Sequence, residues 1–202
     1  MHVCSNDLDN NSIIYLYSII LSIFTFFIIL IPFYNTLQKH FNFTIPIWIE
    51  TPSIIGLYHF YLKIYDKYFW KYNFIKYIGL PKIPNLNGLW IAEIVSSHDE
   101  TTKKAEVLIS QAFSKFSMVL KTDESTSYTT VASFSLNNPI HKTITYSYLS
   151  KPRSSSSNSM NIHEGTATLE IFEDESKLEG YYYSGRGRLT YGDIKIERKN
   201  KG

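Results

Sequence analysis

The sequence predicts two regions of different fold class. We expect an N-terminal two-helix transmembrane hairpin over residues 1–82, and then an all-β, up-and-down antiparallel barrel of about eight strands over residues 83–202. Two observations carry this prediction. Residues 13–33 contain no charged side chain, whereas the chain after Asn85 alternates apolar and polar residues in short runs separated by turn-forming residues.

The first predicted membrane span is "IIYLYSIILSIFTFFIILIPF", Ile13 to Phe33. At 1.5 Å per residue, a helix of this length crosses a hydrocarbon core of roughly 30 Å. Its Ser and Thr hydroxyls can bond to carbonyls of the same helix, which lowers their cost in a membrane. A cleaved signal peptide fits poorly, because the preceding "MHVCSNDLDNNS" has no Lys or Arg and no small-x-small cleavage site follows.

The second predicted span runs from about Pro52 to about Tyr68 and is less apolar than the first. It is short and rich in aromatic residues, which are typical of the membrane interface. Lys63 and Lys67 can extend their ammonium groups to the lipid headgroups. An amphipathic helix that lies on the membrane surface is the alternative, and the residues leave it open.

The distribution of lysines predicts the orientation. The N-terminal flank has no Lys or Arg, and the loop from Tyr34 to Thr44 has Lys39 alone. The positive-inside rule places the flank with most lysines in the cytoplasm. With two spans, both termini and the barrel are then cytoplasmic. That flank carries Lys63, Lys67, Lys71, Lys76 and Lys82.

The barrel strands follow from period-2 alternation between turn signals. Antiparallel strands with short connections predict an up-and-down barrel, whose interior at about eight strands can hold side chains or one small ligand. The predicted strands are "GLWIAEIVSS", "AEVLISQAF", "KFSMVLKT", "SYTTVASFSL", "KTITYSYLS", "GTATLEIFE", "KLEGYYYS" and "GDIKIERK".

The same alternation predicts which side chains face inward. On the last strand Ile194 and Ile196 point in, and the parity extended backwards puts Thr190, Arg188 and Arg186 on the inner side. Tyr146, Tyr148 and Tyr182 are either core residues or pocket residues. Ser, Tyr and Arg on one inner face are polar for a pure core and favour a pocket. The other inward sets are Trp90, Ala92, Ile94 and Ser96; Phe116, Met118 and Leu120; Ile144; and Ala167, Leu169 and Ile171.

The sequence offers no catalytic or metal-binding motif. The six histidines have no metal-ligand spacing, and Cys4 is the single cysteine. There is no nucleophile elbow and no phosphate-binding loop. The formal charge of +2 does not indicate a nucleic-acid polymer as partner. We therefore expect no enzyme, no metal and no cofactor.

Two successive blocks and the closing segment resemble a known family. "GLYHFYLKIYDKYFWKY" is followed by "GLPKIPNLNGLWIAEIVSS", and the chain closes with "GRGRLTYGDIKIERK". This order is similar to the membrane-anchored β-barrel effectors of bacterial CBASS antiphage systems, which have two transmembrane segments and a STING-like role. The resemblance spans the chain from the first span to Lys199. It makes Gly88 and Trp90 structural residues of the barrel; Ala92 departs from it, because a Gly is expected there.

The resemblance implies a function that composition does not show. The barrel would sense a cyclic dinucleotide made by a partner cyclic-oligonucleotide synthase, a nucleotidyltransferase, during phage infection. Binding would promote self-association at the bacterial inner membrane and kill the infected cell by damage to that membrane. Stacking on tyrosines and charge-assisted bonds to phosphates suit such a ligand. The expected ligand-binding residues are Ser96, Ser97, Tyr146, Tyr148, Tyr182, Arg186, Arg188 and Thr190.

Two alternatives belong to other functional classes. A membrane-anchored, lipocalin-like carrier of a small lipophile also suits the barrel and Gly88-x-Trp90, but Arg186 and Arg188 speak against an apolar interior. A structural membrane adaptor needs no pocket at all.

Overall fold

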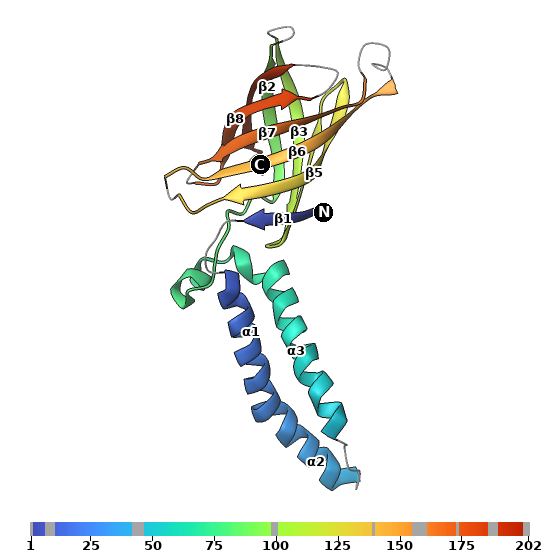
Figure 1. Ribbon diagram of the computed structural model, residues 1–202, viewed down its shortest axis with the longest axis vertical. Coiled ribbons are helices and arrows are strands. Elements are labelled where there is room, and N and C mark those ends of the chain that lie inside the picture. The colour runs from blue at the N-terminus through green and yellow to red at the C-terminus, as the bar shows by residue number, and fades with distance from the viewer. Residues whose placement is uncertain are drawn as a thin grey trace. The chain divides into compact units, whose positions relative to one another are not determined.

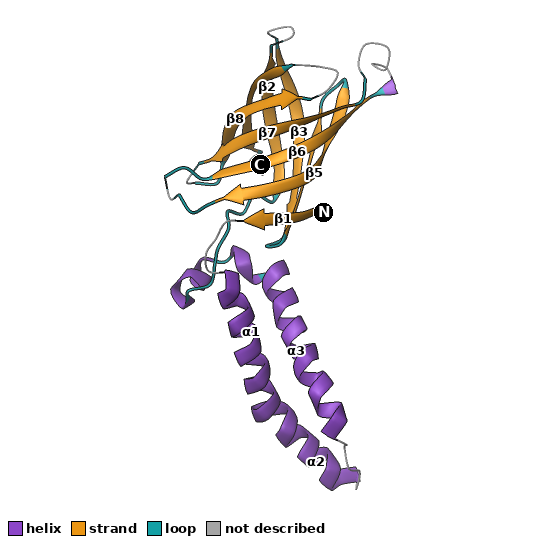
Figure 2. Ribbon diagram, in the orientation of Figure 1, coloured by secondary structure: helices purple, strands orange, loops and turns teal. Residues whose placement is uncertain are grey.

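A computed structural model describes residues 2–6, 11–41, 47–97, 101–138, 140–154, 161–172, 174–185 and 190–199. The chain divides into two compact units (Figure 1). One unit is Asp9–Lys82; the other joins Met1–Leu8 to Ile83–Gly202. The first unit is helical and the second is built from strands (Figure 2).

The helical unit begins with one long apolar helix. It consists of α1 (Asn11–Thr25), a π-helical segment (Phe26–Leu30) and α2 (Ile31–Phe41). Within the described residues, the stretch Ser12–His40 is the one helix long and apolar enough to cross a membrane, and it contains the predicted span 13–33. Ser18, Ser22 and Thr36 donate hydrogen bonds to carbonyls of their own helix, as we expected.

The second helix, α3 (Ile47–Lys67), is followed by the short 3₁₀ helices η2 (Phe69–Lys71) and η3 (Asn73–Ile78). The hydroxyls of Thr25 and Tyr61 lie 2.7 Å apart and join α1 to α3. The hydroxyl of Tyr17 donates to the carbonyl of Ile78 at 2.9 Å, and α1 is thereby also held to η3. A second crossing of the membrane by α3 stays a prediction.

The β unit is a closed antiparallel barrel, which confirms the predicted up-and-down architecture. Each strand pairs with the next along the chain, and the last strand pairs with β2 to close the barrel, with Ala92 opposite Ile196. Its strands are β2 (Gly88–Ser96), β3 (Thr102–Gln111), β4 (Lys115–Lys121), β5 (Ser125–Ser135), β6 (Thr143–Pro152), β7 (His163–Ile171), β8 (Lys177–Ser184) and β9 (Tyr191–Arg198).

An additional strand, β1 (His2–Asn6), belongs to the barrel and was not predicted. It pairs antiparallel with β4 and parallel with β5, beside which it lies in Figure 1. Its sequence HVCSN does not alternate apolar and polar residues, so the strand signal is absent. The barrel unit therefore includes residues that precede the first apolar helix.

The barrel interior is filled with apolar side chains at the end where β2 begins, which we call the closed end. Trp90 is 1% exposed, and its indole N–H donates to the carbonyl of Leu86 at 2.9 Å. The guanidinium of Arg198 lies 4.4 Å from the Trp90 ring centre and donates to the carbonyls of Asn85 and Asn87. Arg198 thus ties the end of β9 to the segment that enters β2.

Gly88 starts β2 with φ of +133°, a conformation that residues with a Cβ rarely adopt.

The inward parity predicted from the sequence is confirmed by burial. The fully or largely buried members are Trp90, Ala92, Phe116, Met118, Ile144, Ala167, Leu169, Ile171, Ile194 and Ile196.

Candidate functional site

The opposite end of the barrel, where β2 ends and β3 begins, contains a cavity of about 110 Å³. We call this end the open end and its cavity the open-end cavity. Its walls carry many hydroxyl groups from inward-facing positions of several strands. Several of these hydroxyls bond within the barrel, as Thr129 does with Met118, and a hydroxyl can also bond a polar ligand. The hydroxyl-bearing residues include Ser96, Ser125, Thr129, Ser150, Ser184 and Thr190.

Three tyrosines line the same cavity. Tyr146 and Tyr148 on β6 have ring centres 6.3 Å apart with an interplanar angle of 52°, and Tyr182 on β8 joins them. Tyr146 is 5% exposed. The pKa of its hydroxyl is raised mainly by burial and to a lesser degree by the neighbouring Tyr148. The Tyr146 hydroxyl therefore stays protonated and can donate a hydrogen bond at neutral pH.

Two glycines leave space for two of these tyrosine rings. Gly165 lies opposite Tyr148 on β7, and a Cβ there would collide with the Tyr148 ring. Gly192 lies opposite Tyr182 on β9, and a Cβ there would lie 2.9 Å from the Tyr182 Cε1. Each ring therefore lies against bare backbone, and the glycines shape the wall of the cavity.

Charged side chains also reach the open-end cavity. Lys103 Nζ lies 3.1 Å from Glu124 Oε2, and both residues line the cavity together with His163. An ammonium group at this place is available to a phosphate, provided that the ion pair with Glu124 opens or rearranges.

The structure brings together most of the predicted site residues that it describes. Ser96, Tyr146, Tyr148, Tyr182 and Thr190 all line the open-end cavity.

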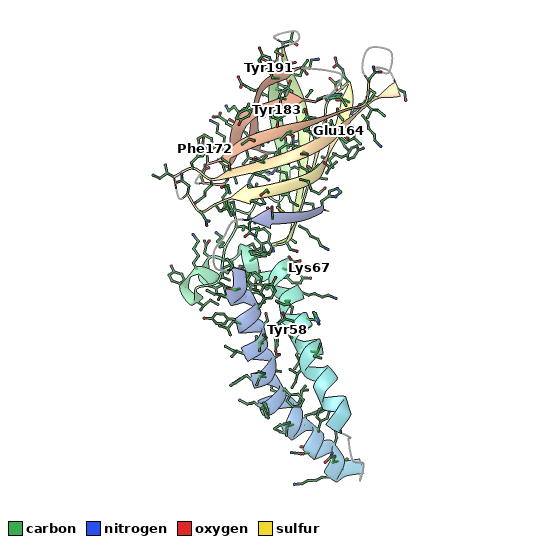
Figure 3. The ribbon with its side chains drawn as sticks, viewed as in Figure 1. Tyr58, Lys67, Glu164, Phe172, Tyr183 and Tyr191 are labelled. Atoms are coloured by element: carbon green, nitrogen blue, oxygen red, sulfur yellow. The ribbon has the colours of Figure 1, made fainter. Side chains whose placement is uncertain are left out.

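Ser97 is placed differently: it lies in the turn after β2, exposed, and its hydroxyl accepts a hydrogen bond from the Tyr191 N–H at 3.2 Å. It does not line the open-end cavity. It lines instead a neighbouring surface hollow with Tyr183 and Tyr191, which Figure 3 labels, and this hollow also borders Ser96 and Tyr182. The alternation that places Ser96 inward places Ser97 outward, so the expectation for Ser97 rests on the family resemblance alone.

Arg186 and Arg188 lie outside the described residues. They belong to the connection between Ser184 and Thr190, both of which line the open-end cavity. The hydroxyl of Thr190 donates to that of Ser184 at 3.0 Å, and the Ser184 N–H donates to the Thr190 carbonyl at 2.7 Å. This connection therefore starts and ends at the cavity.

Several cavity residues were missed by the sequence analysis, although the parity signal could have found most of them. Extending the inward sets by one step along β6 reaches Ser150 and by two steps along β7 reaches His163, and the same alternation on β8 leads from Tyr182 to Ser184. Lys103 lies on β3, for which no inward set was predicted. Thr129 could not be found this way, because the register of β5 against β6 shifts between Thr129 and Val131.

Comparison with known proteins identifies the family. The family model described as "Cap15, cyclic dinucleotide receptor domain" matches residues 81–198, which cover the described barrel strands β2 to β9. The chain belongs to the Cap15 family. Cap15 proteins are CBASS effectors, and this membership confirms the resemblance read from the sequence.

Two Cap15 relatives match over most of their length. The CD-NTase-associated protein 15 of Yersinia aleksiciae is 30% identical over 164 residues, which are 79% of this chain and 76% of the relative. The CD-NTase-associated protein 15 of Staphylococcus schleiferi is 26% identical over 153 residues, 75% of this chain and 80% of the relative. Both matches are longer than the receptor-domain match, which covers residues 81–198.

Proposed function

We propose that this chain is a membrane-anchored effector whose open-end cavity binds a cyclic dinucleotide. The observation that carries the proposal is the combination of three tyrosines with a ring of hydroxyls inside a Cap15 receptor barrel. The two relatives are named for association with a CD-NTase, which supports a nucleotidyltransferase as the source of the ligand.

The cavity chemistry matches the ligand. A cyclic dinucleotide has two bases, which stack on tyrosine rings, and two phosphates, which accept hydrogen bonds from hydroxyls and cations. We assign base stacking to Tyr146, Tyr148 and Tyr182, and phosphate contacts to Arg186 and Arg188, with Ser96 and Thr190 as hydroxyl donors. A carrier of a lipophile would instead need an apolar lining.

The size of the cavity supports a role for the residues at its mouth. Its volume of about 110 Å³ is below the roughly 300–1,000 Å³ typical of small-molecule pockets. A bound dinucleotide therefore extends from the cavity into the mouth. The connection that carries Arg186 and Arg188 leaves the barrel there, which favours these arginines over the deeper side chains for the phosphates.

Strand β1 supports a two-pass topology. Residues 2–6 pair with β4 and β5, so the N-terminus and the barrel lie on the same side of the membrane. A chain that crosses the membrane through the apolar helix Ser12–His40 must then return before β2, and α3 is the helix available for the return. The lysines behind α3 favour the cytoplasm for the barrel and both termini.

Killing would follow from self-association. Anchoring confines the effectors to two dimensions, so a modest gain in affinity between copies has a large effect on assembly. Bound ligand in the barrel would promote contact between the helical units of neighbouring copies, and their assembly would disrupt the inner membrane.

Calorimetry on the full chain tests the proposal. The protein in detergent micelles is titrated with cyclic di-AMP, cyclic di-GMP and cyclic GMP–AMP. One of these should bind, and Arg186→Ala should weaken binding about 10- to 100-fold, because a charge-assisted hydrogen bond contributes about 1.5–3 kcal/mol. Lys195→Ala, which removes one positive charge from the outer face, is the matched control and should bind like the parent. Parental affinity in both Arg186→Ala and Arg188→Ala would refute the phosphate assignment.

A further inference from the structure

The seam between β4 and β5 is an irregular place in the barrel wall. The two strands pair directly over Val119–Lys121 and Thr126–Tyr128. At the next position the side chain of Thr129 replaces the backbone ladder: its hydroxyl donates to the Met118 carbonyl at 3.1 Å and accepts from the Met118 N–H at 3.2 Å. Beyond Thr129, no further direct pair joins β4 to β5 in the described residues, and another strand lies between them.

That strand is β1. It pairs with β4 at Phe116 and Lys115, and with β5 from Ala132 to Phe134. It is held by backbone pairing with both neighbouring strands. Outside that ladder the Cys4 N–H donates to the Ser114 carbonyl at 2.9 Å, and the Ser5 and Ser133 hydroxyls lie 2.9 Å apart on the exposed face. Cys4 is buried, with 8% of its surface exposed. Without β1, two backbone edges would face each other unpaired, and unpaired edges accept another strand.

We propose that the β4–β5 seam is a strand-accepting site, and that β1 of one copy occupies the seam of a neighbouring copy when the effector assembles. The inference rests on the ligand-driven self-association of the proposed function and names its contact. A second copy is the favoured occupant because its β1 offers the same residues to the same seam. Exchange of an identical element between protomers replaces every contact that it breaks.

The seam also borders the proposed ligand site. Thr129 and Met118, which close the seam through their hydrogen bonds, both line the open-end cavity. A ligand group that takes the Thr129 hydroxyl removes its bonds to Met118. The connection between β4 and β5 that lies next to β1 is then weaker. Ligand binding in the cavity therefore favours release of β1 for exchange.

A disulfide that can form only between copies tests this proposal. In a Cys4→Ser background, one population of full-length chains carries Ser5→Cys and a second carries Ser133→Cys, with different affinity tags. The two are reconstituted together in vesicles of bacterial lipid, mixed with the cyclic dinucleotide from the calorimetric panel that binds, and oxidised mildly. We expect a disulfide-linked heterodimer that increases several-fold with the ligand.

The matched control replaces Ser133→Cys by Tyr128→Cys. Tyr128 is on the same strand and exposed, but it pairs with Val119 of β4 and not with β1. It should give no ligand-dependent heterodimer, because chance collisions in the membrane do not depend on the seam.

Lysine crosslinking of the same samples separates the two proposals. Ligand-dependent assembly without the disulfide-linked heterodimer would overturn strand exchange and leave the proposed function standing. Ligand binding without any assembly would overturn the self-association that both need. A single chain that carries Ser5→Cys together with Ser133→Cys, oxidised before the ligand is added, should hold β1 in its own seam. It should lose assembly while it still binds the ligand.

Discussion

The two ends of the barrel are built on the same alternation but hold different side chains. At the closed end the inward positions carry Trp90, Phe116 and Phe134, each at most 1% exposed. At the open end the same inner face presents Ser96, Tyr148 and Ser184 to a cavity. One strand, such as β2 from Trp90 to Ser96, passes from core to site along its length. Period-2 parity thus identifies the inner face, and the chemistry of each residue determines its role there.

The difference predicts that substitutions at the closed end change stability, whereas substitutions at the open end change ligand affinity. Each variant below is therefore measured twice, by chemical denaturation of the free protein and by calorimetry with the cyclic dinucleotide that binds.

Trp90→Ala should have the largest effect. Loss of a fully buried indole from a packed core costs about 3–5 kcal/mol of unfolding free energy. Leu89→Ala changes the adjacent residue, which is 57% exposed on the outer face, and should cost less than about 0.5 kcal/mol. Equal denaturation midpoints for the two variants would show that Trp90 is not a core residue.

Arg198→Met should destabilise the barrel by about 1.5–3 kcal/mol, because it keeps an apolar stem but loses charge-assisted bonds to the carbonyls of Asn85 and Asn87. Ligand affinity per folded molecule should not change, since Arg198 does not line the open-end cavity. If the folded Arg198→Met variant bound the ligand more weakly than the parent, the separation between a stability end and a ligand end would be contradicted.

Tyr182→Ala should lower ligand affinity about 5- to 150-fold through a lost stacking energy of about 1–3 kcal/mol. Tyr182→Phe keeps the ring over Gly192 and is the control that should bind nearly as well as the parent. If Tyr182→Ala lowers the denaturation midpoint and leaves affinity intact, Tyr182 is a core tyrosine and the pocket interpretation is wrong for it.

The smallest expected effect comes from a pair of neighbours. Ser96→Ala removes an inward hydroxyl and should reduce affinity about 2- to 12-fold, which corresponds to about 0.5–1.5 kcal/mol. Ser97→Ala removes a hydroxyl that bonds to Tyr191 on the outer side and should change affinity less than about two-fold. If Ser97→Ala reduced affinity more than Ser96→Ala, Ser97 would belong to the site, as the family resemblance implies.

Much of the barrel could be predicted from the sequence, because alternation and turns are local signals. The bounds of β2, β4 and β8 differ little from the predicted runs. What could not be predicted depends on contacts between distant segments. Strand β1 is recognisable only by its partners on β4 and β5, and the bulge near Thr129 reverses the parity of β5 without any Gly or Pro to mark it.

The same division holds for the candidate site. Parity found Tyr146, Tyr148 and Tyr182 because regular strands carry them. Ser97 is expected in the site only through the family resemblance, because the alternation that places Ser96 inward places Ser97 outward. Arg186 and Arg188 lie in a connection between strands, where parity has no physical basis, and their assignment rests on the family and on the ends of that connection.

Strand β1 also has a consequence for the order of events during synthesis. Its residues are translated before the other strands of the barrel, yet the residue opposite Cys4 is Ala132. At roughly 5–20 residues per second, β1 waits on the order of 6 to 26 s for that partner. During this interval the apolar helix emerges and can enter the membrane, while the first strand is still without its seam. Neighbouring ribosomes on one messenger would bring several such waiting strands close together, and dense synthesis would therefore favour a first pairing between copies.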